Sequence, residues 1–170
     1  MSTVTAIILA RNEEKHIVDC IKSIQFADEI LVIDDGSTDQ TVSLATELGA
    51  LFIPHPLNGD WSQQRRFGIS QAQSEWILFV DSDERVSQEL AKSIQRAIQG
   101  EPKAYWLHRY NLFHHNQATH GVVRPDKVLR LMPREGATVE GAVHEVFISP
   151  YPQATLEGKL YHYTYDNWHQ

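Results

Sequence analysis

The chain has 170 residues, of which 42% are apolar and 22% are charged, a composition typical of one soluble globular domain. Its formal net charge of −7 argues against a dedicated nucleic-acid binder. The longest apolar runs, Ala6–Ala10 and Trp76–Val80, are far shorter than the roughly 20 residues that a membrane-spanning helix needs. There is no signal-peptide pattern, and Cys20 is the only cysteine, so we expect a cytoplasmic protein without a disulfide framework.

Strand and helix patterns alternate through the first hundred residues. Short β-rich apolar runs predict strands at Val4–Leu9, Ile30–Ile33, Leu51–Ile53 and Trp76–Val80. Apolar residues at helical spacing predict helices at Glu13–Ile24, Ser37–Leu48, Trp61–Ala72 and Ser87–Ile98. Repeated strand–helix units predict an α/β fold with a mainly parallel sheet flanked by helices.

The pattern changes after Pro102. Four further strands are predicted, with no convincing helix between them: Ala104–Leu112, Lys127–Met132, Val143–Ile148 and Lys159–Thr164. We expect these strands to add antiparallel pairs beside the main sheet, which divides the chain into residues 1–101 and 102–170. The chain stops at Gln170 without a helix cap or a polar tail, so we expect a C-terminal helical segment to be missing.

Polar clusters follow three of the predicted strands, at Arg11–Glu13, Asp34–Asp35 and Asp81–Asp83. Ligands bind at the carboxyl ends of strands in open parallel sheets, so these clusters indicate one site. Asp81 and Asp83 can hold a hard divalent cation that leaves positions open for phosphate oxygens. The sequence has neither a P-loop nor a dinucleotide-binding glycine fingerprint, so a nucleotide would be held through its base and a metal.

Three blocks carry a resemblance to a known family. Ala6–Glu14, Val32–Asp39 and Phe79–Glu84 together resemble family 2 glycosyltransferases of the GT-A fold. Arg130–Leu131 and Val143–Glu145 extend the resemblance to bacterial lipopolysaccharide core β-1,4-glucosyltransferases, which act on an inner-core heptose. The resemblance implies a Rossmann-like sheet with a nucleotide-sugar-binding half at 1–101 and acceptor-side strands at 102–170. It also implies an inverting transfer of glucose from a UDP-sugar.

The resemblance further assigns substrate-binding residues. The implied set comprises Ala10, Asn12, Glu13, Asp35, Arg65, Asp81 and Arg130. The residues Ala10, Asn12 and Glu13 would line the nucleotide pocket, and Asp35 would accept a hydrogen bond from the uracil ring. Arg65 would lie near the pyrophosphate, and Asp81 would lie near the ribose or the metal.

Metal binding and catalysis are assigned in the same way. Asp83 would ligate Mn²⁺ or Mg²⁺, and His162 would complete the metal site, unless it is only a half-buried strand residue. Glu145 would be the general base that removes a proton from the acceptor hydroxyl. The alternatives are that Glu145 faces solvent, or that His144 is the base.

Four basic residues, Arg124, Lys127, Arg130 and Arg134, lie close together in the second part of the chain. They predict either a solvated face or a surface for an anionic glycolipid acceptor, with peripheral contact to the cytoplasmic face of the inner membrane. Zinc binding by the loop histidines His114, His115 and His120 is a weaker alternative.

Two other functions compete with glycosyl transfer. A nucleotidyltransferase also uses strand-end carboxylates and a metal, but it usually has a loop rich in Gly, Arg and Lys after its first strand, where this chain has Arg11–Glu14. A truncated domain that binds a nucleotide-sugar without turnover would carry the same donor residues.

Overall fold

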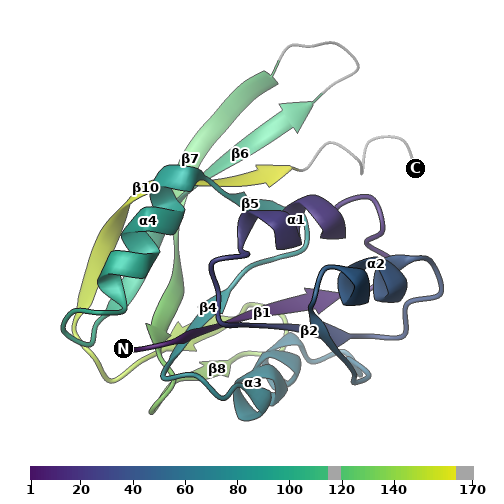
Figure 1. The fold of residues 1–170 in the computed structure, drawn as a ribbon, viewed down its shortest axis with the longest axis horizontal. Coiled ribbons are helices and arrows are strands. Elements are labelled where there is room, and N and C mark those ends of the chain that lie inside the picture. Colours follow the sequence, from purple (N-terminus) through teal and green to yellow (C-terminus); the bar gives the residue numbers. More distant parts are fainter. Residues whose placement is uncertain (115–119, 164–170) are drawn as a thin grey trace.

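The computed structural model describes residues 1–114 and 120–163, which form a mixed α/β domain (Figure 1). The helices are α1 (Ile17–Ser23), α2 (Thr41–Glu47), α3 (Trp61–Gln71) and α4 (Gln88–Ala97). The first five strands are β1 (Val4–Ala10), β2 (Glu29–Asp34), β3 (Leu51–Pro54), β4 (Trp76–Phe79) and β5 (Glu84–Val86). The remaining strands are β6 (Ala104–His114), β7 (His120–Pro133), β8 (Thr138–Glu140), β9 (Val146–Ile148) and β10 (Gln153–Tyr163).

Eight strands form one sheet in the order β3-β2-β1-β4-β7-β6-β10-β5, and β8 and β9 form a separate pair. The strands β1 to β4 are parallel to their neighbours among themselves, as the alternating sequence pattern predicts. The chain runs outward from β1 to β2 and β3, and β4 then pairs on the other side of β1. Such a reversal of strand order opens a crevice at the carboxyl ends of the strands, which is where polar residues follow β1 and β4.

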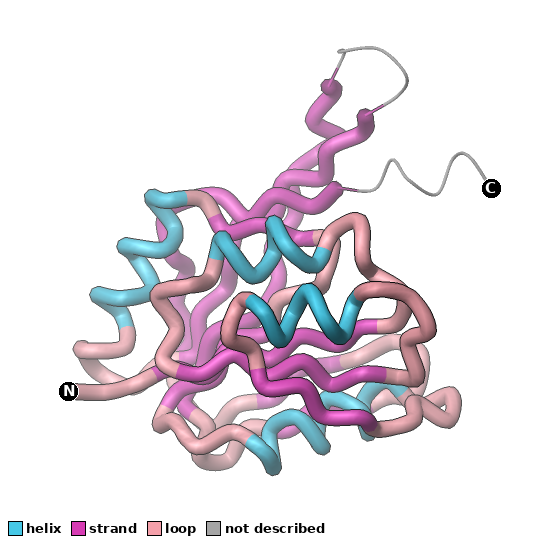
Figure 2. The backbone as a smooth tube through the Cα atoms, turned by 45° about the vertical axis from the view of Figure 1, so that its right-hand side comes forward, coloured by secondary structure: helices cyan, strands magenta, loops and turns pink. Residues whose placement is uncertain are grey.

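Helices cover both faces of the sheet, as Figure 2 shows, and each face has its own apolar core. Alternate residues of β1 face opposite ways, so Ile8 packs in the core under α1, α2 and α4, whereas Ile7 packs in the core on the α3 side. Gly68 lets α3 approach this strand closely, because an added Cβ would lie 2.7 Å from a methyl group of Ile7. The sheet is therefore buried on both faces, which holds the ends of its strands rigidly in place.

The structure differs from the prediction at the first helix. Helix α1 begins at Ile17 rather than Glu13, after a turn in which the His16 and Ile17 amides donate to the Glu13 carbonyl. The amide of Glu13 donates instead to the Thr41 hydroxyl at the start of α2, at 2.8 Å. This long-range contact holds Glu13 at the end of β1 and delays the helix.

The C-terminal part adds antiparallel pairs, as predicted, and one parallel pair. Strand β7 runs antiparallel to both β4 and β6, whereas β10 is parallel to β6 and antiparallel to β5. Strands β5 and β8 were not predicted, because three residues are too few for a periodicity. No helix among the described residues is long and apolar enough to cross a membrane.

We expect Gly158→Ala to destabilise the fold strongly. Gly158 lies in β10 at φ +111°, where an added Cβ would sit 2.6 Å from the backbone of Leu90 in α4. The left-handed backbone and the clash should together cost at least about 2 kcal/mol of unfolding free energy. Urea denaturation measures the loss, and Gly100→Ala is the matched control, since its added methyl meets only the Ala97 carbonyl oxygen, at 3.6 Å. Equal losses in the two variants would contradict this account of Gly158.

Candidate active site at the ends of β1 and β4

A first cavity of about 230 Å³ opens where β1 and β2 end. Its lining consists of Leu9, Ala10, Arg11, Glu13, Asp35, Leu57, Trp61 and Gln64. The Asp35 carboxylate is held in place, because one oxygen accepts from the Leu57 amide at 2.9 Å and the other lies 3.6 Å from Arg11. Trp61, at the start of α3, is 44% exposed and presents a flat apolar surface. The cavity thus combines a fixed carboxylate with an aromatic wall.

Asn12 is not among the residues that line this cavity, although the sequence placed it there. Its side-chain oxygen accepts from the backbone amide of Thr38 at 2.8 Å, and its backbone amide donates to the Ser37 hydroxyl at 2.8 Å. Asn12 adopts φ 53°, a left-handed conformation that asparagine tolerates better than most residues. It joins the loop after β1 to the loop before α2 and so shapes the cavity from outside.

A second cavity of about 360 Å³ adjoins the first and shares Leu9, Glu13 and Trp61 with it. Its other lining residues are Arg65, Asp81, Ser82, Asp83, Val143, Glu145 and His162. Residues from α3, the β4–β5 turn, the segment before β9 and the end of β10 therefore meet in one place. The structure brings together six of the residues that the sequence singled out: Glu13, Arg65, Asp81, Asp83, Glu145 and His162.

Asp83 and His162 are in contact in the wall of this cavity. The His162 Nε2 lies 3.1 Å from an Asp83 carboxylate oxygen, and its Nδ1 lies 2.8 Å from the Asn111 side-chain oxygen. Burial lowers the pKa of His162, but the hydrogen bond to Asp83 and the charge of that carboxylate raise it further, so it ends above its usual value. The antiparallel pairing of β5 with β10 produces this contact, which no local sequence pattern could show.

The acidic residues alone do not enclose a metal. Within the described part of the chain, no three His, Cys, Asp or Glu side chains lie close enough to hold an ion by themselves. Asp83 and His162 nevertheless offer an oxygen and a nitrogen side by side. That donor set fits a divalent cation whose remaining ligands come from substrate phosphates and water.

Arg65 connects the cavity walls from its position in α3. Its Nε donates to Glu145 at 2.6 Å and one terminal nitrogen donates to Asp81 at 3.0 Å. The other terminal nitrogen is buried without a hydrogen-bond partner among the described residues. Phe79 and Phe147 flank the guanidinium, with ring centres 5.6 and 5.3 Å from its carbon. This packing fixes the group that orients both carboxylates.

Arg130 lines neither of the first two cavities. It is 4% exposed, and its guanidinium binds both Glu84 oxygens at 2.6 and 3.0 Å and Asp81 at 3.3 Å. The pairing of β6 with β7 shifts by one residue between Tyr105 and Trp106, so Arg130 is the additional residue of a bulge, which turns its side chain toward these carboxylates. These ion pairs give Arg130 a positioning role, and its substrate contact stays a prediction.

Glu84 is the functional residue that the sequence reasoning missed. Its side chain is fully buried, and one oxygen accepts from the Asp81 amide at 2.8 Å. A signal was available: Arg130 stands alone in the apolar run Val128–Met132, and a buried arginine needs a carboxylate partner. What the sequence could not tell was which carboxylate it meets.

The four basic residues do not form one surface. Arg130 is buried, and Arg134 donates to the Ser74 carbonyl at 2.8 Å, beside the start of β4 and thus at the far end of that strand from Asp81. Lys127 is exposed, and the side chain of Arg124 lies outside the described residues. The same is true of His115 and of the side chains of His114 and His120.

A third cavity of about 380 Å³ adjoins the second and shares Arg65, Asp81 and Glu145 with it. Its remaining lining comes mainly from β6, β7 and β9: Trp106, Arg109, Lys127, Val128, Leu129, Arg130, Val146 and Phe147. The two cavities therefore meet at the Glu145 carboxylate.

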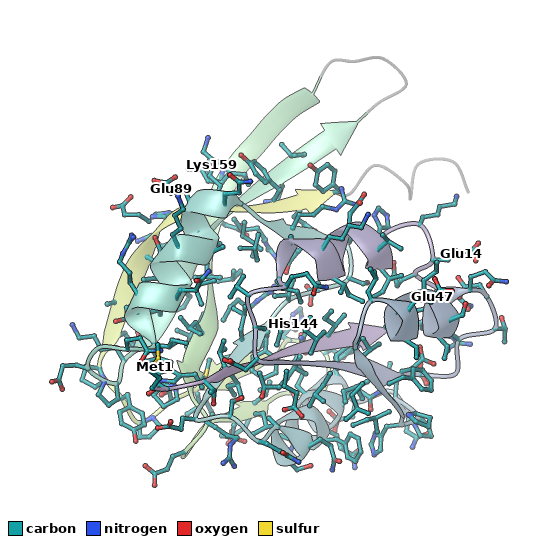
Figure 3. The ribbon with its side chains drawn as sticks, in the orientation of Figure 1. Met1, Glu14, Glu47, Glu89, His144 and Lys159 are labelled. Atoms are coloured by element: carbon teal, nitrogen blue, oxygen red, sulfur yellow. The ribbon has the colours of Figure 1, made fainter. Side chains whose placement is uncertain are left out.

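Glu145 does not lie in a strand, contrary to the prediction. Residues 142–144 form a bend, and β9 begins only at Val146. The bend is tied to α3, because the Trp61 amide and the Ser62 hydroxyl donate to carbonyl groups of the bend. His144, labelled in Figure 3, is exposed, whereas Glu145 turns inward to Arg65. The bend thus separates the two candidate bases.

The sequence model of the family described as Glycosyl transferase family 2 matches residues 5–151. An uncharacterised glycosyltransferase of Rickettsia typhi is 30% identical over 149 residues, which cover 85% of this chain and 51% of the relative. The chain therefore spans about half the length of that relative. The lipopolysaccharide core biosynthesis glycosyltransferase LpsC of Rhizobium meliloti is 32% identical over 99 residues, covering 55% of this chain and 36% of LpsC.

A solved structure shows the same fold. Glucosyl-3-phosphoglycerate synthase from Mycobacterium tuberculosis, in complex with Mn²⁺, UDP and glucosyl-3-phosphoglycerate, matches with a TM-score of 0.51. The match has 22% identity and covers 65% of this chain and 44% of the synthase chain. The fold of the chain is accordingly GT-A-like.

Asp81 should make the stability of the protein depend on acid pH. Burial disfavours its charge, but the guanidinium groups of Arg130 and Arg65 outweigh burial and hold the pKa of Asp81 well below its usual value. The stabilisation is therefore complete above the unfolded-state pKa, near pH 4, and is lost as pH falls through the lower folded-state pKa. Asp81→Asn should lose less unfolding free energy than the wild type between about pH 5 and pH 2.

Urea midpoints measured across this pH range test the expectation. Asp19→Asn is the control, because the Asp19 side chain is 61% exposed. Parallel pH profiles for the wild type and Asp81→Asn would show that the ion pairs of Asp81 contribute nothing to stability.

Proposed function

Because the chain belongs to glycosyl transferase family 2, we propose that it transfers a hexose from a UDP-sugar to a hydroxyl group of a glycan acceptor, with inversion at the anomeric carbon. The observation that carries the proposal is the pair of contiguous cavities at the ends of β1 and β4. One contains the fixed Asp35 carboxylate, and the other contains Asp83, His162 and Glu145.

The first cavity suits the uracil base. The Asp35 carboxylate can accept a hydrogen bond from the N3–H of uracil, whereas the matching ring nitrogen of adenine, N1, carries no hydrogen. Trp61 provides an aromatic face beside it, and aromatic rings pack favourably against flat π-systems. The diphosphate would then extend into the second cavity, past Glu13 and Trp61, which line both.

Asp83 and His162 would hold the divalent cation, Mn²⁺ or Mg²⁺, together with diphosphate oxygens. A bound cation of this kind neutralises charge on a departing diphosphate. The support from relatives is that the mycobacterial synthase structure contains Mn²⁺ and UDP.

Glu145 would act as the general base. Arg65 binds one oxygen of its carboxylate at 2.6 Å, which leaves the other free to accept the proton of the acceptor hydroxyl. As that proton moves to Glu145, the acceptor oxygen forms its bond to the anomeric carbon, and the bond from that carbon to the UDP oxygen breaks. UDP leaves with the bonding electrons, so no covalent enzyme intermediate is formed.

The acceptor we favour is a lipopolysaccharide core glycan, with an inner-core heptose as the acceptor sugar and glucose as the transferred sugar. The likeness to LpsC, named as a core biosynthesis glycosyltransferase, supports this choice. The reaction would take place at the cytoplasmic face of the inner membrane. A competing function, nucleotide-sugar binding without turnover, predicts the same donor cavities but no role for Glu145.

Donor binding should depend on a metal held by Asp83. Calorimetric titration with UDP should show higher affinity in Mn²⁺ than in EDTA, because the cation screens repulsion between the diphosphate and the acidic cavity. Asp83→Asn should reduce the affinity in Mn²⁺ to the value in EDTA, whereas Asp19→Asn should not change it. Equal affinities of the wild type in Mn²⁺ and EDTA would exclude the metal role.

Glu145→Gln should abolish most turnover while leaving donor binding intact. Glutamine can still accept the Arg65 hydrogen bond but cannot take up the proton, so kcat should fall by about 10²–10⁴. Radiolabelled sugar transfer measures kcat, and calorimetry with UDP confirms an intact donor site. His144→Gln, at the neighbouring exposed position, is the control. If His144→Gln is crippling and Glu145→Gln is mild, histidine is the base; if neither variant changes turnover, the catalytic role of this segment is excluded.

A further inference from the structure

We propose that the third cavity binds a sugar that carries a phosphate or carboxylate group, with Lys127 contacting the anionic group and Trp106 contacting the sugar ring. The proposal rests on the function proposed above, because we identify this sugar as the acceptor. It assigns a second binding site and the chemical class of its ligand.

The position of the third cavity suits an acceptor. Asp81, Arg65 and Glu145 form the wall that it shares with the second cavity. Asp83 and His162 line only the second cavity, so a sugar in the third cavity would reach Glu145 without occupying the place of the metal. The nucleophilic hydroxyl and the donor diphosphate would then meet at the residues that the two cavities share.

Among the described residues, each basic side chain that lines the third cavity is bound to a carboxylate, with the exception of Lys127. Arg65 and Arg130 are bound to the carboxylates described above, and Arg109 binds Asp126 at 2.8 Å and Glu84 at 3.3 Å. Lys127 is exposed and forms no ion pair or hydrogen bond within the described residues. Its ammonium group is therefore the cation available to a ligand. An ammonium group binds phosphate or carboxylate as a point charge.

Trp106 lies on the same side of the sheet as Lys127. Trp106 pairs with Leu129, and His108 pairs with Lys127 two residues further along, so these four side chains leave one face of the β6–β7 pair. The indole N–H of Trp106 donates to the Gln153 side-chain oxygen at 3.1 Å, which fixes the ring. A fixed, half-buried aromatic ring beside a free ammonium group matches a ligand with an apolar ring face and a charged substituent.

The tryptophans provide a separate signal for each site. Trp61 lines the first and second cavities, Trp106 lines the third, and Trp76 is 4% exposed and lines none of these three. In ¹⁵N-labelled full-length chain, we expect UDP with Mg²⁺ to shift the indole resonance of Trp61. Glucose 6-phosphate and glucuronate should shift the indole resonance of Trp106. Glucose should shift it too, but with an affinity about tenfold lower.

Variants at Lys127 test the charge. Lys127→Gln should reduce the affinity for glucose 6-phosphate to that for glucose, whereas Lys127→Arg should retain most of the difference. Lys92→Gln, at an exposed position in α4, is the matched control and should change nothing. Lys127 is exposed, so melting temperatures of these variants should match the wild type.

The source of the anionic sugar can be separated in the same assay. One arm uses the soluble hexose phosphate, and the other uses the same hexose phosphate on an alkyl chain in neutral micelles. A shift of Trp106 in either arm supports the site, and a stronger shift in micelles identifies a lipid-linked ligand.

The proposal is overturned by a Trp106 resonance that no anionic sugar moves, or by a preference for anionic sugars that survives Lys127→Gln. Failure of the proposed donor site looks different, because Trp61 would then not respond to UDP while Trp106 still responded to the hexose phosphate. A Trp106 resonance that responds to UDP alone would assign the third cavity to the donor and also overturn the proposal.

Discussion

The buried carboxylate of Glu84 is the interaction on which the rest of the site depends. It binds Arg130, Arg109 and the backbone amide of Asp81 while being fully withdrawn from water. Removing one partner of such a pair typically costs about 3–5 kcal/mol, because an uncompensated charge stays behind. The end of β4 is therefore fixed by ion pairs where the apolar core gives way to the polar crevice.

The network extends from Glu84 to the reacting groups in a continuous chain of contacts. Arg130 connects Glu84 to Asp81, and Arg65 connects Asp81 to Glu145. Each guanidinium lies between two carboxylates, so no carboxylate in the wall can move without disturbing another. This arrangement keeps Asp81 ionised despite its burial and holds Glu145, which lies between the bend at 142–144 and β9, in a defined place.

The two parts of the chain, residues 1–101 and 102–170, line different cavities. The first cavity is lined entirely by residues from 1–101, and the third mainly by residues from 102–170. Both parts contribute to the second cavity, and one continuous sheet joins them. A donor half and an acceptor half, as proposed from the sequence, would thus meet at the Arg65–Asp81–Glu145 wall.

The sequence by itself determined the α/β class, the parallel direction of the first four strands and the family, because these depend on local periodicity and on contiguous motifs such as Asp81–Asp83. It also singled out most residues that line the first two cavities. It did not show that the side chains of Asn12 and Arg130 are bound by Thr38 and Glu84, because only folding brings these partners near. Tertiary structure alone decided that Arg130 and Arg134 lie apart from Lys127, and that Lys127 has no ion-pair partner among the residues that the structure describes. Strand register and a one-residue bulge set those positions, and a linear pattern of residue types contains neither.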